Sequence, residues 1–247
     1  MLHWVRFVFF ASLITLGVGL YQGDTLPPVT ELLAGLEDEP VQEAARREPF
    51  QTTVGGITYR INPLYRYRLY GLVVSKHESD AFWDRAHKAW GDHLNVADLC
   101  VVWGSNAFSG IYQRLKFSSG QWTCYWQGSA MEDWERFSPY KISNNHMLAD
   151  RRDILKTLRK VRVGDQVYFE GYLAEYGHGN FSRGTSITRT DTGNHACETV
   201  YTEQLSILKH GPGIWRLVRW ISAVALILSI CAWFLMPMHY HIHAGRG

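Results

Sequence analysis

Cys197 is the residue of this chain best placed in sequence to act as a nucleophile. His195 precedes it by two positions, and Arg189 lies a short distance upstream. A thiol becomes nucleophilic when a nearby imidazole or cation stabilises its thiolate, so one interpretation is a catalytic cysteine. In that interpretation His146 or His195 is the base and Arg189 binds the oxyanion. The local signatures of envelope transpeptidases are absent, and a disulfide-bonded or simply buried cysteine, which we favour, fits the same residues.

Histidines and carboxylates elsewhere raise the question of a metal site, because imidazole and carboxylate ligands suit zinc. The candidates are His146, Asp150, His178 and His195. No pair among them has the spacing of a known metal motif, so polar loop residues are the favoured interpretation. The spacing of His77, His87 and His93 places no two of them on adjacent turns of one helical face. The alternating tail His239–His243 fits a flexible polar end better than a metal site. We predict no metal and no other cofactor.

Arg189 and Asp191 lie in a turn rich in glycine and asparagine, where they either anchor an anionic ligand or hold their own loop together. Asn145 and His146 form a second polar pair that is either ligand-binding or structural. The sequence contains no phosphate-binding loop, no dinucleotide fingerprint and no serine nucleophile elbow.

Four cysteines are too few for a disulfide scaffold, but a single bridge is predicted. Cys231 lies in an apolar segment, and Cys100 lies in a continuously apolar run that favours an inert, buried thiol. Cys124 and Cys197 both lie near strand ends beside turns, where two backbones can approach closely enough for a disulfide. We therefore predict the bridge Cys124–Cys197.

The central region must position these residues, and its pattern is mostly strand. Alternating or apolar runs occur at 65–74, 99–103, 111–117, 122–126, 167–173 and 196–207, with a hairpin expected around Ser118–Gln121. Two helices are expected, one capped by Ser79 and Asp80 and one over Asp150–Lys160. The predicted fold class is α+β, with an antiparallel sheet or a small, partly open barrel and two short helices.

Two apolar segments flank this region. Phe7–Gly23 contains no charged residue, and neither does Trp220–Met238. A helix needs about 20 residues to cross the hydrocarbon core, so the second segment is predicted to span a membrane. The first is an anchor or a cleaved signal peptide, and the anchor is favoured. The predicted divisions are an anchor (1–23), an acidic tether containing proline (24–50), the α+β domain (51–208), an amphipathic lead-in (209–219), a transmembrane helix (220–238) and a His-rich tail (239–247).

Charge constrains the partners and the orientation. The 247 residues carry a formal net charge of +2, which excludes a nucleic-acid binder that acts through a strong basic field. Arg6 precedes the first segment and acidic residues follow it, whereas Lys209, Arg216 and Arg219 precede the second. A long translocated domain largely escapes the positive-inside rule. We therefore expect both termini in the cytoplasm and the domain on the extracytoplasmic side of the inner membrane.

Three stretches carry a family resemblance: Asn144–Asp150, Val163–Leu173 and Ser186–Glu198, which includes Thr188-Arg189-Thr190-Asp191-Thr192-Gly193 and Ala196-Cys197-Glu198. Over roughly residues 140–201 the chain resembles an uncharacterised family of bacterial membrane-anchored envelope proteins. The segment Phe181–Ser186 departs from the tryptophan and paired serines expected there. The resemblance implies an envelope location and a folded domain, but no activity.

The favoured function is that of a non-enzymatic membrane-anchored envelope protein, an accessory subunit or interaction module of a membrane complex. Its expected partners are the lipid bilayer and other membrane or envelope proteins. The tethered architecture and the absence of a complete catalytic motif support this interpretation. A thiol-dependent enzyme using Cys197 and a domain that binds a small ligand or a metal remain as alternatives.

Overall fold

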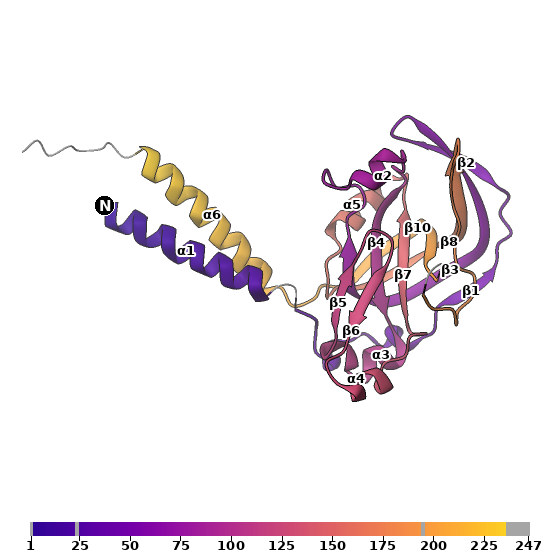
Figure 1. Ribbon diagram of the computed structural model, residues 1–247, viewed down its shortest axis with the longest axis horizontal. Helices are drawn as coiled ribbons and strands as arrows, with labels where there is room; N and C mark the ends of the chain where they lie inside the picture. The colour runs from indigo at the N-terminus through magenta and orange to yellow at the C-terminus, as the bar shows by residue number, and fades with distance from the viewer. Residues whose placement is uncertain (1, 23–24, 194–195, 236–247) are drawn as a thin grey trace, which may run out of the picture. The chain divides into compact units, whose positions relative to one another are not determined.

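The computed structural model describes residues 2–22, 25–193 and 196–235. The chain forms two compact units, one comprising residues 26–211 and the other the two ends of the chain. The larger unit is a mixed α+β domain (Figure 1), which confirms the predicted fold class.

The larger unit contains the following strands and helices. The strands are β1 (Val41–Ala44), β2 (Phe50–Val54), β3 (Ile57–His77), β4 (Asn95–Val102), β5 (Lys116–Ser119), β6 (Cys124–Gln127), β7 (Ile142–Leu148), β8 (Gln166–His178), β9 (Phe181–Arg183) and β10 (Glu198–Lys209). The helices are α2 (Arg85–Ala89), α3 (Gly104–Phe108), α4 (Met131–Arg136) and α5 (Arg152–Lys160), with 3-10 turns η1 (Val29–Glu31), η2 (Ala34–Glu37) and η3 (Ile111–Gln113).

One eight-stranded sheet organises the domain, and the long strand β3 is its centre. Residues Arg60–Leu72 of β3 pair with β8, and Leu72–His77 pair with β4. The pairing continues from β4 to β7, then in parallel to β10, and from β10 back to β8. The parallel ladder is short, covering only Glu198–Tyr201 of β10, and most of the other ladders contain register shifts. The sheet is therefore not a clear barrel.

The inner face of these strands holds the main hydrophobic core. Alternate residues of a strand point to the same face, and in β8 Val167, Phe169 and Leu173 are fully buried in this way. Ile154 and Leu158 of α5 pack against the same core, so the predicted second helix forms and covers it. Burial of such large apolar side chains stabilises the fold by about 1.5–3 kcal/mol each.

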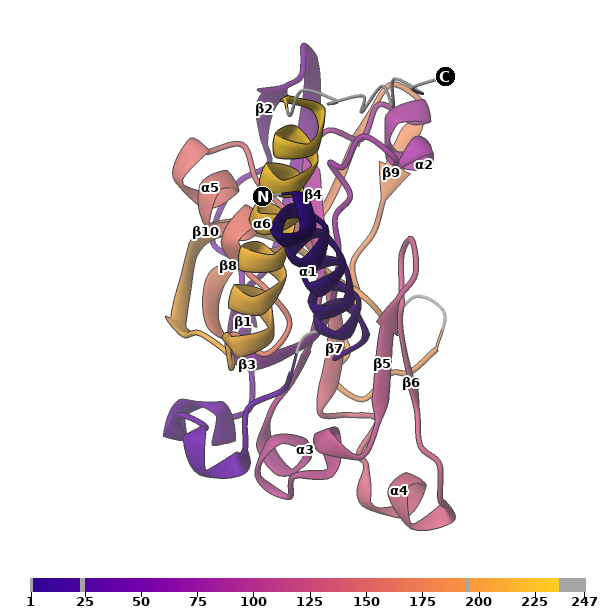
Figure 2. The same cartoon turned by 90° about the vertical axis from the view of Figure 1, so that its left-hand side faces the viewer.

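A second core lies on the outer face of β3 and β4. It joins Leu72, Val74 and Val102 to Leu36 of η2 and to residues around the β5–β6 hairpin. A hairpin forms close to the predicted place and lies beside β7 (Figure 2), but its turn lies about two residues later and Ile111–Gln113, predicted as strand, is the 3-10 turn η3. Residues 26–50, expected to be a tether, belong to the same compact unit, because β1 pairs with β3 and Leu36 is fully buried.

The smaller unit consists of α1 (Leu2–Gln22) and α6 (Ile214–Leu235), which pack against each other (Figure 1). The hydroxyl oxygens of Thr15 and Ser222 are 2.8 Å apart, and the Phe9 ring meets the Trp233 ring. These pairs show that the helices are antiparallel. Both are long and apolar enough to cross a membrane. The helix α6 begins at Ile214 and so includes part of the predicted lead-in, whereas the His-rich tail lies outside the described residues.

Candidate thiol site

A cavity of about 900 Å³ opens on the outer face of β7 and β10. Its polar wall contains Cys197, His146 and Thr199, and β9 with the segment that follows it forms another side. The rings of Trp90 and Trp122 also line it and stack with their centroids 4.7 Å apart. The cavity therefore combines a thiol and an imidazole with an aromatic wall.

His146 is held by a carboxylate on the neighbouring strand. Asp98 of β4 lies directly opposite His146 of β7 in the sheet register, and the distance from Nδ1 to the Asp98 Oδ1 is 2.7 Å. Asp98 is fully buried and His146 is 3% exposed. Because Nδ1 is engaged by the carboxylate, Nε2 is the ring nitrogen left for the cavity. The sheet thus fixes the orientation of the imidazole.

The charges around His146 favour the imidazolium form. Burial lowers the pKa of His146, but the charge and hydrogen bond of Asp98 and the adjacent Cys197 sulfur outweigh it and raise the pKa to about 9. The ring is therefore protonated at neutral pH. An imidazolium beside a thiol is the arrangement in which protein thiolates become nucleophiles.

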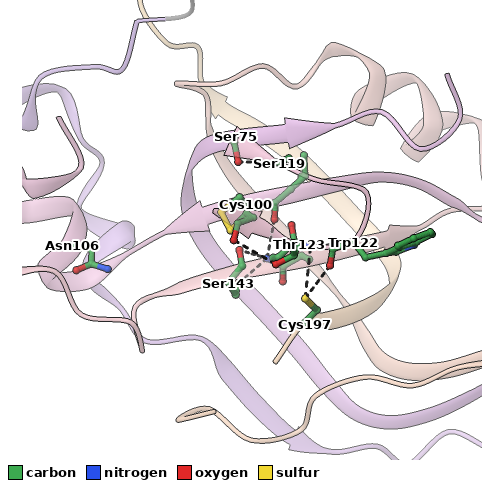
Figure 3. The surroundings of a disulfide bond; sticks show 12 residues. Ser75, Cys100, Asn106, Ser119, Trp122, Thr123, Ser143 and Cys197 are labelled. Carbon is green, nitrogen blue, oxygen red and sulfur yellow. Dashed lines mark hydrogen bonds between the residues drawn. A yellow bond between two sulfur atoms is a disulfide. The ribbon is translucent and has the colours of Figure 1, made fainter. Parts of the chain in front are cut away.

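Two further groups contact the sulfur. The thiol of Cys197 donates to the carbonyl oxygen of Trp122 at 3.4 Å (Figure 3), and the Asn144 Nδ2 lies 3.8 Å from Sγ. Asn144 shares the outer face of β7 with His146, two positions away. Its Oδ1 is buried and forms no hydrogen bond with a described residue. The Asn144 amide is therefore a side-chain N–H donor within 3.8 Å of the sulfur.

The predicted bridge Cys124–Cys197 is wrong. Cys100 and Cys124 form the disulfide, with their Cα atoms 6.0 Å apart, and Cys197 is a free thiol. Cys100 points to the outer face of β4, and the β5–β6 hairpin folds over that face (Figure 3). A hydrogen bond between the hydroxyl groups of Ser75 and Ser119 also joins the hairpin to the sheet there. Cys100 is completely buried, as its apolar run indicated, but the hairpin that buries it also supplies its partner.

Arg189 does not approach the thiol. Its guanidinium binds the Glu198 Oε1 at 2.7 Å and lies over the ring of Trp103, which is part of the inner core. Glu198 and Cys197 are adjacent on an extended chain, so their side chains point to opposite faces. Burial raises the pKa of Glu198 to about 7, although Arg189 lowers it. Arg189 is thus not placed to bind an oxyanion at Cys197.

The other predicted site residues are dispersed. The carboxylate of Asp191 accepts a hydrogen bond from Ser186, so it does not pair with Arg189. Asn145 Nδ2 donates to the carbonyl oxygen of Leu99 and to Ser143 on the inner side of the sheet. His195 lies outside the described residues.

Three of the four residues considered as a zinc site, His146, Asp150 and His178, lie within the described part of the chain, and they lack a common centre. Asp150 accepts hydrogen bonds from Thr52 and Tyr201. The ring of His178 forms a hydrogen bond with the carbonyl oxygen of Trp90, and the ring of His146 forms one with Asp98. Among the described residues, these side chains form no group with metal-ligand geometry.

A chain of hydrogen bonds continues from Asp98 away from the thiol. Asn95 Nδ2 lies 3.1 Å from the Asp98 Oδ1 and 3.3 Å from the His87 Nε2. The other nitrogen of His87 contacts Asp84, which also contacts His77. Burial raises the pKa of Asp84, but the hydrogen bonds from the two histidines lower it to about 2. Spacing along the sequence does not connect these residues, because they meet only in the folded domain.

Two members of the thiol site, Asp98 and Asn144, were not predicted. The alternation of side chains along a strand could have indicated them, because residues two positions apart lie on the same face. Asp98 shares a face with Cys100, and Asn144 shares one with His146. The strand register that brings Asp98 to His146 joins residues far apart in sequence.

No protein-family model matches this sequence, and no curated protein matches it.

Proposed function

We propose that this chain is a membrane-anchored, thiol-dependent enzyme of the acyl-transfer class, a hydrolase or a transpeptidase. The observation that carries the proposal is the buried Asp98–His146 pair beside the free thiol of Cys197 in a cavity. In this proposal Cys197 is the nucleophile, His146 the general base and acid, and Asp98 the group that orients the imidazole.

The reaction begins with attack of the Cys197 thiolate on a substrate carbonyl carbon. A C–S bond forms, and the carbonyl electron pair moves to the oxygen, which accepts a hydrogen bond from the Asn144 Nδ2. The intermediate collapses with cleavage of the bond to the leaving amine or alcohol, which takes the proton of the His146 imidazolium. Water or a second amine, deprotonated by His146, then attacks the thioester and releases the thiolate.

The cavity wall favours a particular class of substrate. Arg183 lines it with its guanidinium 4.9 Å above the ring of Trp122, and it forms no ion pair with any described residue. A positive charge beside an aromatic wall suits an amide or ester that carries a carboxylate and an apolar group. We therefore propose acidic acyl substrates.

We propose that this site lies on the extracytoplasmic side of the cytoplasmic membrane. The antiparallel packing of α1 and α6 supports a location of both termini on the same side, because each helix is long enough to cross once. The Cys100–Cys124 disulfide supports an oxidising compartment for the domain, since such bonds persist there and are rare in the cytosol.

A second candidate function is the favoured interpretation of the sequence, a non-enzymatic envelope protein that acts as an accessory subunit or interaction module. Large exposed side chains support it, among them Phe82, which is 82% exposed, Trp83 and Trp134. Aromatic residues are enriched in protein interfaces. Under this candidate the Asp98–His146 pair is a structural element of the sheet.

Alkylation of Cys197 by iodoacetamide, followed by mass spectrometry of the detergent-solubilised full chain, separates the two candidates. The enzyme predicts faster alkylation of Cys197 in the wild type than in His146→Gln at pH 7, because the imidazolium stabilises the thiolate. A thiol without an imidazolium partner loses about tenfold in rate per pH unit below about pH 8.5. We expect the His146→Gln variant to show that dependence, and alkylation of Cys231 serves as the internal reference.

A chromogenic ester supplies the second readout. We expect a burst of one equivalent of acyl group on the wild type, none on Cys197→Ser, and a burst rate about 100-fold lower for His146→Gln. Wild-type alkylation no faster than that of His146→Gln at pH 7, with no burst, would favour the non-enzymatic candidate.

A further inference from the structure

His77, Asp84 and His87 form a compact cluster at the far end of the hydrogen-bond chain. His77 ends β3, Asp84 precedes α2, and His87 lies within α2. The Asp84 Oδ2 is 2.8 Å from the His77 Nε2 and 2.8 Å from the His87 Nδ1. The ligand atoms of all three residues lie within 4.8 Å of one another. The fold thus collects two imidazoles and a carboxylate around a single point.

The spacing fits a transition-metal ion. Zinc binds imidazole nitrogen and carboxylate oxygen at about 2.0–2.2 Å, so neighbouring ligand atoms in a tetrahedral site are about 3.3 Å apart. The two contacts of 2.8 Å are about half an ångström shorter. Small rotations of these side chains would therefore open the cluster to the required size.

We propose that His77, Asp84 and His87 bind a divalent transition metal, with zinc the best match to two imidazoles and one carboxylate. The side chains of Asp84 and His87 are 0% and 1% exposed, whereas that of His77 is 21% exposed. The fourth coordination position therefore faces solvent on the His77 side and takes water or an external ligand.

The surroundings supply the supporting contacts that metal ligands need. The Asp84 Oδ1 accepts hydrogen bonds from the backbone N–H groups of Ala86 and His87, at 3.1 and 3.0 Å, which leaves Oδ2 for the metal. A histidine that binds metal through Nδ1 must donate its Nε2 proton to an acceptor. Asn95 faces that nitrogen, and its buried Oδ1 forms no hydrogen bond with a described residue. Rotation of this amide would provide the acceptor, with loss of its hydrogen bond to Asp98.

Zinc content measured by mass spectrometry tests the site on the full chain in detergent. His239, His241 and His243 are replaced by alanine in every sample, because this tail offers competing imidazoles. After equilibration with zinc and removal of the excess, we expect one zinc per chain. We expect its loss in His77→Ala and its retention in His93→Ala, which removes an exposed histidine from the same region.

A second variant guards against simple misfolding. Asp84→Asn keeps a good N-cap for α2 but removes the carboxylate ligand. We expect it to fold, to lose zinc, and to lose the rise in unfolding temperature that zinc produces in the parent chain. Absence of zinc from the parent, or equal zinc in the parent and in both variants, would overturn the proposal. Zinc that disappears only in Cys197→Ala would overturn it as well, by assigning the metal to the thiol site.

Discussion

At the scale of single residues, the contact between Asp98 and His146 links the protonation of one ring to the stability of the domain. The folded-state pKa of His146 is about 9, above its ordinary value of 6.5. A raised pKa stabilises the folded state fully below pH 6.5, and this contribution is lost as the pH rises through 9. The wild type should therefore lose up to about 3 kcal/mol of unfolding free energy across this range, while His146→Gln lacks this loss.

Urea titrations followed by tryptophan fluorescence, made between pH 6 and 10, check this prediction. Glu198 titrates at about pH 7 in the fold, so the relevant quantity is the difference between the wild type and His146→Gln at each pH. A difference that does not change between pH 6.5 and 9.5 would contradict the assigned ion pair.

Some residues of the thiol site were predicted from the sequence, and others were not. Cys197 and His146 were both singled out by chemical type, and the structure brings them together in one cavity. Asp98 was not predicted, because the strand register that brings it to His146 joins distant parts of the sequence. Arg189 was predicted to bind an oxyanion at the thiol, but its partner Glu198 lies on the opposite strand face. These are properties of the folded sheet, and local spacing in the sequence does not contain them.

At the scale of elements, the close approach of β8 to β10 holds in position the strand that begins immediately after Cys197. A Cβ at Gly171 of β8 would lie 2.0 Å from the carbonyl oxygen of Tyr201 in β10. Backbone atoms cannot yield as a flexible side chain does, so Gly171→Ala should lower the unfolding free energy by about 3 kcal/mol or more. Gly184→Ala is the matched control, because no atom lies within 4 Å of its added Cβ. We expect it to change stability by less than about 0.5 kcal/mol.

Thermal and urea unfolding of the two glycine variants give the comparison directly. Equal stability of Gly171→Ala and Gly184→Ala would contradict the close packing of β8 against β10.

Elements with strong local signals were predictable, whereas those that depend on packing were not. The β5–β6 hairpin and α5 formed at or close to the places that turn residues and an apolar stripe indicated. The expected helix capped by Ser79 and Asp80 is instead the short α2, capped by Asp84, and Phe82 is exposed rather than buried. The two histidines that bind the Asp84 carboxylate hold it at the cap position. One of these histidines lies in β3, so the periodicity of the helix alone could not indicate its contact with Asp84.

At the scale of the whole chain, both terminal helices and the disulfide constrain the topology. Each apolar segment was predicted from length and hydropathy, and each forms a helix long enough to cross a membrane. In the sequence, the charges that flank α1 and those that flank α6 indicate opposite sides of the membrane for the domain. The antiparallel pairing of Thr15 with Ser222 favours two crossings. In the proposed topology, two crossings would leave both termini on one side of the membrane and residues 26–211 on the other.

The last prediction tests this topology with single cysteines. Cys197 and Cys231 are replaced by serine, the Cys100–Cys124 disulfide is kept, and either Glu135→Cys, at an exposed position of α4, or Gly247→Cys is added. An impermeant maleimide applied to intact cells should label Glu135→Cys, while Gly247→Cys should be labelled only after permeabilisation. Peptide mapping without reductant should recover Cys100 linked to Cys124, because an oxidising compartment maintains the bond. Labelling in the reverse pattern, with Cys100 and Cys124 both reduced, would place the thiol site in the cytoplasm and would leave its chemistry to be tested there.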